Sequence, residues 1–247
     1  METQSANPQA FGYSMMRVNI LYIVIAMMGC NSNRPHFCET NDCSIGSDNS
    51  SLGRIIKADK FVDLLDTTRV LSDHTSASFE IDFSTNALHL FAWLEEDDIQ
   101  YTYTTRDTCI WKDPCIEFFF DPGADGIDYY ELQFNAYPQV SDLKLKGARG
   151  PINAPENMIP WDIGDNYGLH KRMGTANDAS DVDQLWTLVA DIPWDKICEG
   201  KPKHGDVWAY NFMRVDYDEN DNPTYWVAYP TGKEMIHHPE TWPTYTF

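Results

Sequence analysis

An indole and a carboxylate six positions apart, Trp111 and Glu117, are the pair of side chains in this sequence best suited to ligand chemistry. Glu117 lies inside an aromatic run, CIEFFFD at residues 115–121, where an apolar residue would be more usual. An aromatic face stacks on the C–H groups of a sugar ring, and a carboxylate accepts strong hydrogen bonds from its hydroxyls. The pair therefore indicates a sugar-like ligand, with an edge Trp and a salt-bridged strand Glu as the alternative.

The next run, DYYELQFNA at residues 128–136, adds Gln133 as a second polar group for the same ligand. Side chains on a strand alternate between its two faces. Glu117 therefore shares a face with Phe119, and Glu131 shares one with Gln133. We expect Glu117 and Gln133 to act on the ligand together with the indole.

The loop between these runs, DPGADGID, contains Asp121, Asp125 and Asp128. Calcium is bound by carboxylates and backbone carbonyls from such turns, so the loop is a candidate structural calcium site without EF-hand spacing. The alternative is a Pro/Gly turn with solvated carboxylates. We predict no cofactor other than this calcium ion, and no cofactor for catalysis.

Two further sets of residues have weaker patterns. His237 and His238 are adjacent, and neighbouring strand residues face opposite ways, so we expect structural or ligand hydrogen bonds rather than one shared metal. The 38 acidic residues are enough for a glycoside hydrolase pair, but no spacing distinguishes two of them. We therefore predict no catalytic residues.

Composition narrows the classes of partner. The chain has 247 residues, which suits one large domain with a leader, and 13% aromatic residues, which favour β-sandwiches and stacking surfaces. The formal net charge of −20 argues against nucleic-acid binding and against docking on anionic lipid.

The N-terminal segment resembles an export leader. One Arg precedes an apolar run at residues 18–28, and Gly29-Cys30 follows, as in a bacterial lipoprotein signal with Cys30 lipidated. The alternatives are a simple signal peptide or an uncleaved anchor. We predict a leader at residues 1–30, a flexible linker at 31–58, and an exported, lipid-anchored protein at the cell surface or in the periplasm, with no other membrane contact.

The six cysteines lack the C-x-x-C spacing of zinc sites. Cys38 with Cys43 is one candidate disulfide in an exported protein. Cys109 with Cys115 is another, provided that the backbone brings them close enough.

The remaining chain, residues 59–247, has the residue pattern of β-strands. Apolar and polar residues alternate, or β-branched and aromatic residues cluster, in eight runs separated by turn residues. We expect an antiparallel β-sandwich of immunoglobulin-like or jelly-roll type, with long loops, a strand near residues 167–173 and one short helix at 193–199. The eight runs are 78–83, 87–94, 115–121, 128–136, 140–146, 185–194, 207–218 and 224–230.

Five of these segments occur in a familiar order: ALHLFAWLEEDD, TRDTCIWKDPCIEFFFDPG, DYYELQFNA, LWTLVADIPWDKI and GDVWAYNFMRVDYD. Their order resembles family 9 carbohydrate-binding modules, and more closely the family 9-like domains of bacterial surface lipoproteins. The resemblance covers residues 59–247. It implies an immunoglobulin-like β-sandwich related to DOMON domains, non-catalytic, gripping glucan or xylan chain ends and containing structural calcium.

The resemblance assigns roles to individual residues. Trp111 matches the family's first sugar-stacking Trp, and Glu117 matches its polar partner. The family has an Arg at about the position of Gln133, so this chain lacks that charged contact. Arg214 on a neighbouring strand would replace it.

The family's second stacking Trp is not matched in place. A gapless match puts that position at Ile236 or His237, while Trp226 and Trp242 lie nearby but shifted. The departure leaves the ligand's identity open.

The resulting hypothesis is non-catalytic binding of plant or algal polysaccharide fragments or chain ends, in support of partner glycoside hydrolases. A structural or adhesion module with a decayed sugar site is one alternative, and a glycoside hydrolase is another. A third is a DOMON-like haem-binding electron carrier, with Met213 and His170 or His89 as iron ligands.

Overall fold

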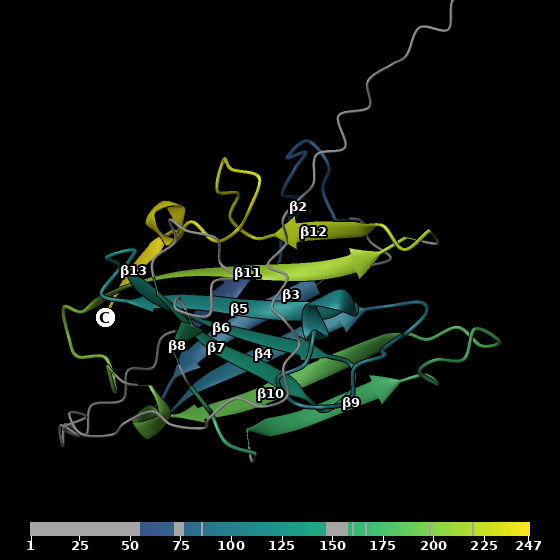
Figure 1. The fold of residues 1–247 in the computed structure, drawn as a ribbon, viewed down its shortest axis with the longest axis horizontal. Helices are drawn as coiled ribbons and strands as arrows, with labels where there is room; N and C mark the ends of the chain where they lie inside the picture. The colour runs from purple at the N-terminus through teal and green to yellow at the C-terminus, as the bar shows by residue number, and fades with distance from the viewer. Residues whose placement is uncertain are drawn as a thin grey trace, which may run out of the picture.

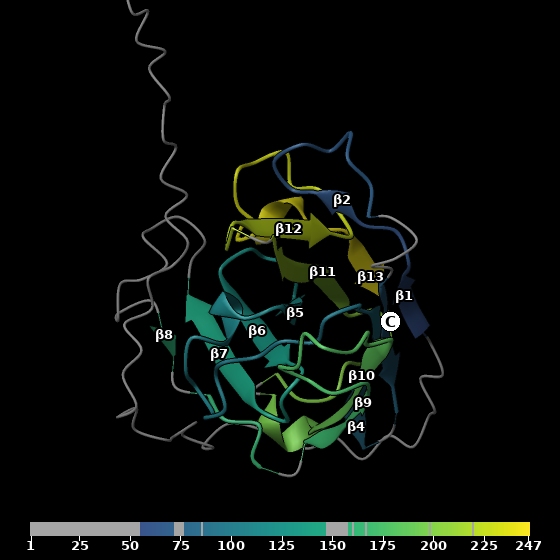
Figure 2. The ribbon, with the colours of Figure 1, turned by 90° about the vertical axis from the view of Figure 1, so that its right-hand side faces the viewer.

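The computed structural model describes residues 55–71, 77–84, 86–146, 158–159, 161–165, 167–197, 199–218 and 220–247. Two antiparallel sheets pack face to face in this part of the chain (Figures 1 and 2). The predicted all-β sandwich is confirmed. The predicted leader, with Cys30, and the linker up to residue 54 lie outside the described residues.

The smaller sheet has five strands in the order β1-β3-β4-β10-β9. Each strand is antiparallel to its neighbours. The strands are β1 (Ile55–Ala58), β3 (Ala77–Phe83), β4 (Ala87–Glu95), β10 (Leu185–Pro193) and β9 (Gly168–Met173).

The larger sheet has eight strands, in the order β2-β12-β11-β5-β6-β7-β8 with β13 also paired to β11. It carries the acidic and aromatic runs singled out in the sequence. The strands are β2 (Val62–Asp63), β12 (Pro223–Val227), β11 (Val207–Tyr217), β5 (Cys115–Pro122), β6 (Asp128–Asn135), β7 (Val140–Lys146), β8 (Met158–Ile159) and β13 (Thr244–Thr246).

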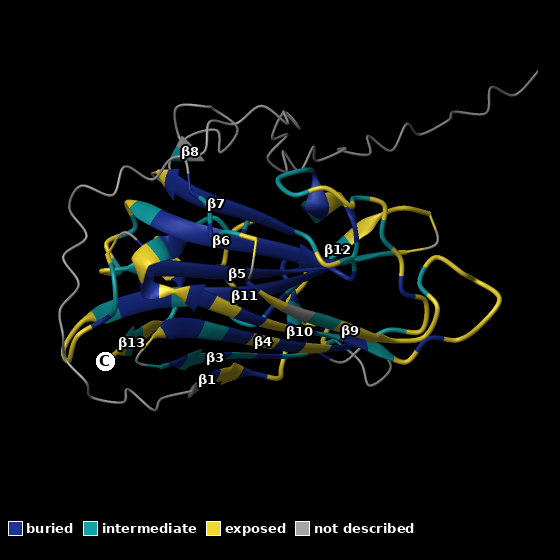
Figure 3. Ribbon diagram, turned by 90° about the horizontal axis from the view of Figure 1, so that it is seen from below, coloured by how far each residue is buried: buried dark blue, intermediate teal, exposed yellow. Residues whose placement is uncertain are grey.

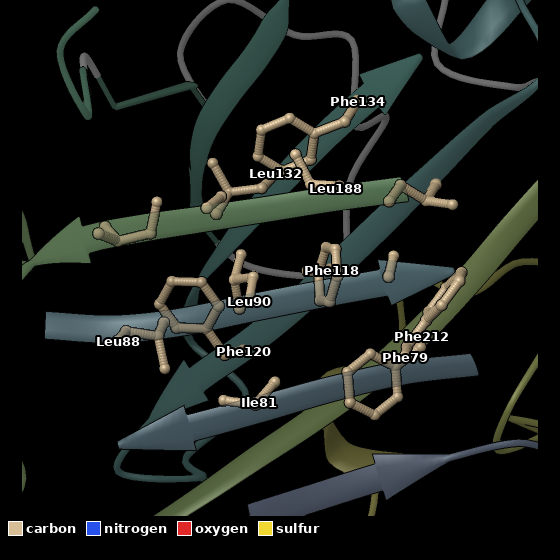
Figure 4. Packing of buried hydrophobic residues seen from close by; sticks show 14 of the residues in the cluster. Phe79, Ile81, Leu88, Leu90, Phe118, Phe120, Leu132, Phe134, Leu188 and Phe212 are labelled. Atoms are coloured by element: carbon tan, nitrogen blue, oxygen red, sulfur yellow. The ribbon is translucent and has the colours of Figure 1, made fainter. Parts of the chain in front are cut away.

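The main core lies between the two sheets. Phe79 of β3 packs against Phe118 of β5 and Phe212 of β11, with ring centroids 5.5 and 5.8 Å apart. Figure 4 shows these rings together with Leu90 and Leu188, which come from the smaller sheet. Burying each such side chain contributes about 1.5–3 kcal/mol, so this layer holds the sandwich together.

The outer face of the eight-stranded sheet is covered as well. Both faces of β5 and β6 are buried, and Figure 3 shows these strands as almost wholly buried. Ile236 and Trp242, from the segment after β12, belong to a second apolar cluster that also contains Phe119 and Tyr129. Polar groups on this face are therefore shielded from water.

The boundaries differ from the predicted ones in two places. Residues 55–58, expected in the linker, form β1, because Ile56 and Ala58 are buried against β3. The helix expected at 193–199 is a single 3-10 turn, Trp194–Lys196. None of the described helices is long and apolar enough to cross a membrane.

Candidate ligand-binding site

Three buried polar side chains meet on the outer face of the eight-stranded sheet. Glu117 on β5 is directly opposite Gln133 on β6, and Glu131 is directly opposite Phe119. The exposed fractions of Glu117, Glu131 and Gln133 are only 2%, 1% and 3%. The Gln133 amide donates a hydrogen bond to the Glu131 carboxylate. Strand alternation and register therefore place two carboxyl groups and an amide in one shielded cluster.

Burial controls the charge of Glu117. Loss of water raises the pKa of Glu117 well above its ordinary value, and the neighbouring Glu131 raises it further. The Cys115 thiol lies 3.9 Å from the Glu117 carboxyl group, and burial raises the pKa of this thiol as well. A protonated carboxyl group donates one hydrogen bond and accepts others. Glu117 can therefore serve a ligand hydroxyl in either direction.

Cys115 is a free thiol, whereas Cys109 is disulfide-bonded. These two cysteines are therefore not joined to each other, and the Cys109–Cys115 disulfide considered from the sequence is wrong. Cys115 instead faces the polar cluster, two residues before Glu117 on the same side of β5.

His237 lies against this cluster, near the position that the sequence match gives to the second stacking Trp. Its Nδ1 is 2.8 Å from the Tyr129 hydroxyl and 3.7 Å from a Glu131 carboxylate oxygen. Its ring is edge-on to Phe119, with centroids 5.7 Å apart. Burial, and secondarily His238, lowers the pKa of His237 to about 4, so the imidazole is neutral at pH 7.

Trp111 lies just before the start of β5. It belongs to the 3-10 turn η1 (Ile110–Lys112), which contacts both β5 and β6. The Tyr217 hydroxyl donates to its carbonyl oxygen over 3.1 Å, and the Lys112 ammonium lies 5.0 Å from the centre of its ring. Trp111 is half-buried, with its backbone bonded to Tyr217 and its ring in contact with the Lys112 side chain.

Among the described residues, the hydrogen-bonding atoms without a partner include Gln133 Oε1 and the Tyr225 hydroxyl on this face, and the indole Nε1 of Trp111 on the turn before β5. Tyr225 lies on β12, and burial followed by the charge of Glu117 raises the pKa of this hydroxyl. Buried polar atoms are normally paired, so these atoms are suited to a polar ligand or ordered water.

Two residues predicted for the site face away from it. Met213, not Arg214, is the β11 neighbour of Glu117, so alternation turns Arg214 toward the opposite face. Its guanidinium donates to the Glu95 carbonyl and to Glu96, over 3.0 and 2.5 Å. This one-residue offset between β11 and β5 is set by the strand register, which the sequence pattern alone does not give.

Trp226 lies directly across from Arg214 on β12 and packs against the main core. The Arg69 guanidinium lies 5.3 Å from the centre of its ring. Trp242 also has a packing role, since its ring leans on Phe119 and its Nε1 donates to the Ile236 carbonyl over 2.9 Å. Neither indole pairs with Trp111 across the Glu117 cluster.

The acidic loop between β5 and β6 forms a turn. Asp121 accepts a hydrogen bond from the Gly126 amide over 2.9 Å, and Asp125 accepts one from the Ile127 amide over 2.8 Å. One oxygen each of Asp121 and Asp128 is buried without a hydrogen bond.

Within the described ranges no three Asp, Glu, His or Cys side chains are grouped to hold a metal. The three aspartates therefore do not fit a calcium site by their side chains alone, and calcium stays a prediction.

The three residues considered as haem ligands lie on three different faces. Met213 is on the outer face of the eight-stranded sheet, and His170 is stacked inside the sandwich on Trp186, 6.5 Å between ring centres. His89 lies on the outer face of the other sheet, paired with Asp191 at 2.5 Å. Ligands of one iron must converge, so this set does not form a haem site.

The fold and the cluster define a β-sandwich with a shielded set of hydrogen-bonding groups on one sheet face. The model of carbohydrate-binding family 9 matches residues 68–247. The chain therefore belongs to carbohydrate-binding family 9. Comparison with curated proteins found no match.

A solved structure with a TM-score of 0.55 shares the fold. A protein of Bacteroides uniformis ATCC 8492, described as "a putative carbohydrate-binding protein", is 20% identical, with a TM-score of 0.55 over 78% of this chain and 86% of that one. A family 9 module of Caldicellulosiruptor kristjanssonii in complex with cellotriose is 14% identical, with a TM-score of 0.43 over 71% and 76% of the two chains. The same organism's module in complex with glucose is 15% identical, with a TM-score of 0.42 over 71% and 78%.

Proposed function

We propose that this chain binds carbohydrate at the Glu117 cluster and does not transform it. The observation that carries the proposal is the buried carboxyl group of Glu117 with two unpaired hydrogen-bonding atoms beside it, Gln133 Oε1 and the Tyr225 hydroxyl, and a third, Trp111 Nε1, on the turn that precedes β5. Sugar hydroxyls both donate and accept, so one ring with several hydroxyls complements a mixed set of donors and acceptors. Membership of carbohydrate-binding family 9 supports the same class of ligand.

In the proposed complex the Trp111 ring stacks on the C–H face of a sugar. The Lys112 ammonium now lies over that ring, so it moves aside or interacts with the bound sugar. Gln133 Oε1 accepts from one hydroxyl, and protonated Glu117 donates to another. The neutral imidazole of His237 lies near the place where a second stacking Trp would contact the ligand. With one stacking indole instead of two, we expect modest affinity and one or two bound sugar rings.

The absence of catalysis is also a proposal. A glycoside hydrolase needs one carboxyl as acid and another as base or nucleophile, with room for water or a covalent sugar between them. Here Gln133 engages Glu131, and both Glu117 and Glu131 are almost completely buried. The engagement of Glu131 by Gln133 supports a non-catalytic role, and release of reducing sugar by the purified protein would overturn it.

The biological setting follows from the leader pattern. We infer export with lipid attachment at Cys30, at the cell surface or in the periplasm, beside glycoside hydrolases that degrade plant or algal polysaccharide. Labelling with a radioactive fatty acid tests the attachment, because Cys30→Ala should abolish the label. A label that survives this substitution would contradict the anchor.

Titration of tryptophan fluorescence with cellobiose and xylobiose tests the binding proposal. Trp111→Ala should weaken binding at least about tenfold, which corresponds to about 1.4 kcal/mol of lost stacking and hydrogen bonding. Trp226→Phe is the matched control, because Trp226 lies on the opposite face of the sheet and its loss should leave the affinity unchanged. Equal affinity of the Trp111→Ala variant and the wild type would refute the proposal.

A further inference from the structure

The outer face of the five-stranded sheet carries exposed apolar side chains, unlike the covered face of the other sheet. Phe91 and Trp93 point outward from β4, and their exposed fractions are 37% and 45%. Val189 on β10 lies directly opposite Phe91 and is 40% exposed. Met173, at the end of β9, is 50% exposed. Figure 3 shows the alternation of exposed and buried positions along β4 and β10.

The size of this patch limits what it can bind. Large side chains each offer about 150–250 Å² in full, so the four exposed fractions together amount to roughly 300 Å². A stable protein interface uses about 800 Å² on each partner. The patch is therefore small for a lasting protein contact, while an apolar area of this size on a monomer is often functional.

Charged groups of both signs flank the patch, since Lys57 on β1 is directly opposite Glu80 and Lys171 on β9 is directly opposite Thr187. Glu80 on β3 is directly opposite Phe91, and Asp82 is directly opposite His89. On the other side, Asp191 pairs with the His89 ring over 2.5 Å. Carboxylates accept strong hydrogen bonds from hydroxyl groups. With a net charge of −20 on the chain, these acceptors favour a neutral, hydroxyl-rich partner over an anionic one.

We propose that Phe91, Trp93 and Val189 form a second binding surface for the middle of a neutral glycan chain. Side chains at positions i and i+2 of a strand are about 7 Å apart. Phe91 and Trp93 can therefore stack on successive sugar rings of a chain that lies along β4. The surface is an open sheet face, so a chain can lie across it without ending there. This inference goes beyond the proposed function, since neither Trp111 nor Glu117 takes part.

Retention of the full chain on insoluble cellulose and insoluble xylan tests this surface. The double variant Phe91→Ser/Trp93→Ser should lower the affinity for at least one of the two polysaccharides about tenfold or more, through loss of stacking. Val182→Ser is the matched control, because Val182 is 75% exposed and lies outside the sheet. It should leave retention unchanged. Circular dichroism spectra and melting curves establish that each variant is folded.

Two results would overturn the proposal. One is retention of the folded double variant equal to that of the wild type; a dimer-to-monomer change of that variant in sedimentation would then identify the surface as a protein contact. The other is failure of the wild type to be retained on either polysaccharide.

A cellobiose titration separates the two sites. The double variant should bind cellobiose as the wild type does, and Trp111→Ala should lose cellobiose binding while it keeps measurable retention on polysaccharide. If the wild type does not bind cellobiose and its retention disappears in the double variant, the function proposed at Trp111 is contradicted and the second surface is supported.

Discussion

At the scale of single residues, Glu117 explains the most about the site. A carboxyl group in an aromatic strand lowers stability unless it is neutral or paired. Burial raises its pKa, and Glu131 acts in the same direction. In the complex that we propose, the environment that makes Glu117 costly to the fold also lets it donate to a ligand oxygen.

This environment predicts a pH-dependent effect of Glu117→Gln. The unfolded chain releases the Glu117 proton near pH 4.3, roughly its reference value, while the folded chain holds it to higher pH. The free energy of unfolding of the wild type therefore falls as the pH rises above that value. Glutamine cannot ionise, so the variant should be more stable than the wild type at pH 8 and nearly equal to it at pH 4.

Urea unfolding at pH 4, 6 and 8 measures this difference. Glu234→Gln is the control, because Glu234 is exposed and should give the same small difference at each pH. A Glu117→Gln variant whose relative stability does not change with pH would show that Glu117 is ionised in the folded protein.

At the scale of elements, two short segments enclose the cluster. The turn η1 brings Trp111 to the start of β5, and the segment after β12 brings His237 and Trp242 onto the sheet. Trp242 fixes this second segment through contacts with Phe119 and Tyr129, whose ring centres are 5.5 and 5.3 Å away. The packing of this indole therefore supports the position of His237 beside Glu131, together with the contacts of His237 itself to Tyr129 and Phe119.

Trp242→Ala should destabilise the chain by about 3–5 kcal/mol, because it leaves a cavity against two aromatic rings. Trp242→Phe retains a ring but loses the indole hydrogen bond to the Ile236 carbonyl, so it should cost about 1–2 kcal/mol. Thermal unfolding compares the two variants. Equal, small losses in both would mean that Trp242 does not anchor the segment.

At the scale of the whole molecule, most of the fold could be predicted from the sequence. The eight strand runs correspond to β3, β4, β5, β6, β7, β10, β11 and β12, and the expected strand near residue 170 is β9. Strong period-two alternation and turn residues make such strands recognisable. β1 was missed because its four residues, IIKA, are too few to show a period next to a polar segment.

The site was less predictable because it depends on register and on covering loops. Trp111, Glu117 and Gln133 could be found, since each lies in or beside a periodic strand. Arg214 was placed on the wrong face, because a shift of one residue reverses a side chain. Tyr225, whose hydroxyl is unpaired, has no sequence pattern of its own beyond alternation on its strand.

The two sheets of the sandwich have outer faces of different character. The larger sheet hides two carboxyl groups and an amide under aromatic cover, whereas the smaller one presents Phe91 and Trp93 to solvent. We therefore propose that short sugars bind at one face and extended chains at the other. A sugar ring binds, in this proposal, at the polar cluster beside Trp111.

The most direct measurement is the indole N–H signal of Trp111 in a nitrogen–proton NMR spectrum during titration with cellobiose and xylobiose. This N–H is buried without a partner, so a bound sugar oxygen should shift its signal in a saturable way. The signal is assigned by its loss in Trp111→Phe. We expect a saturable shift of the Trp111 signal while the Trp226 signal stays in place. Binding detected by other signals while that of Trp111 stays unchanged would contradict it.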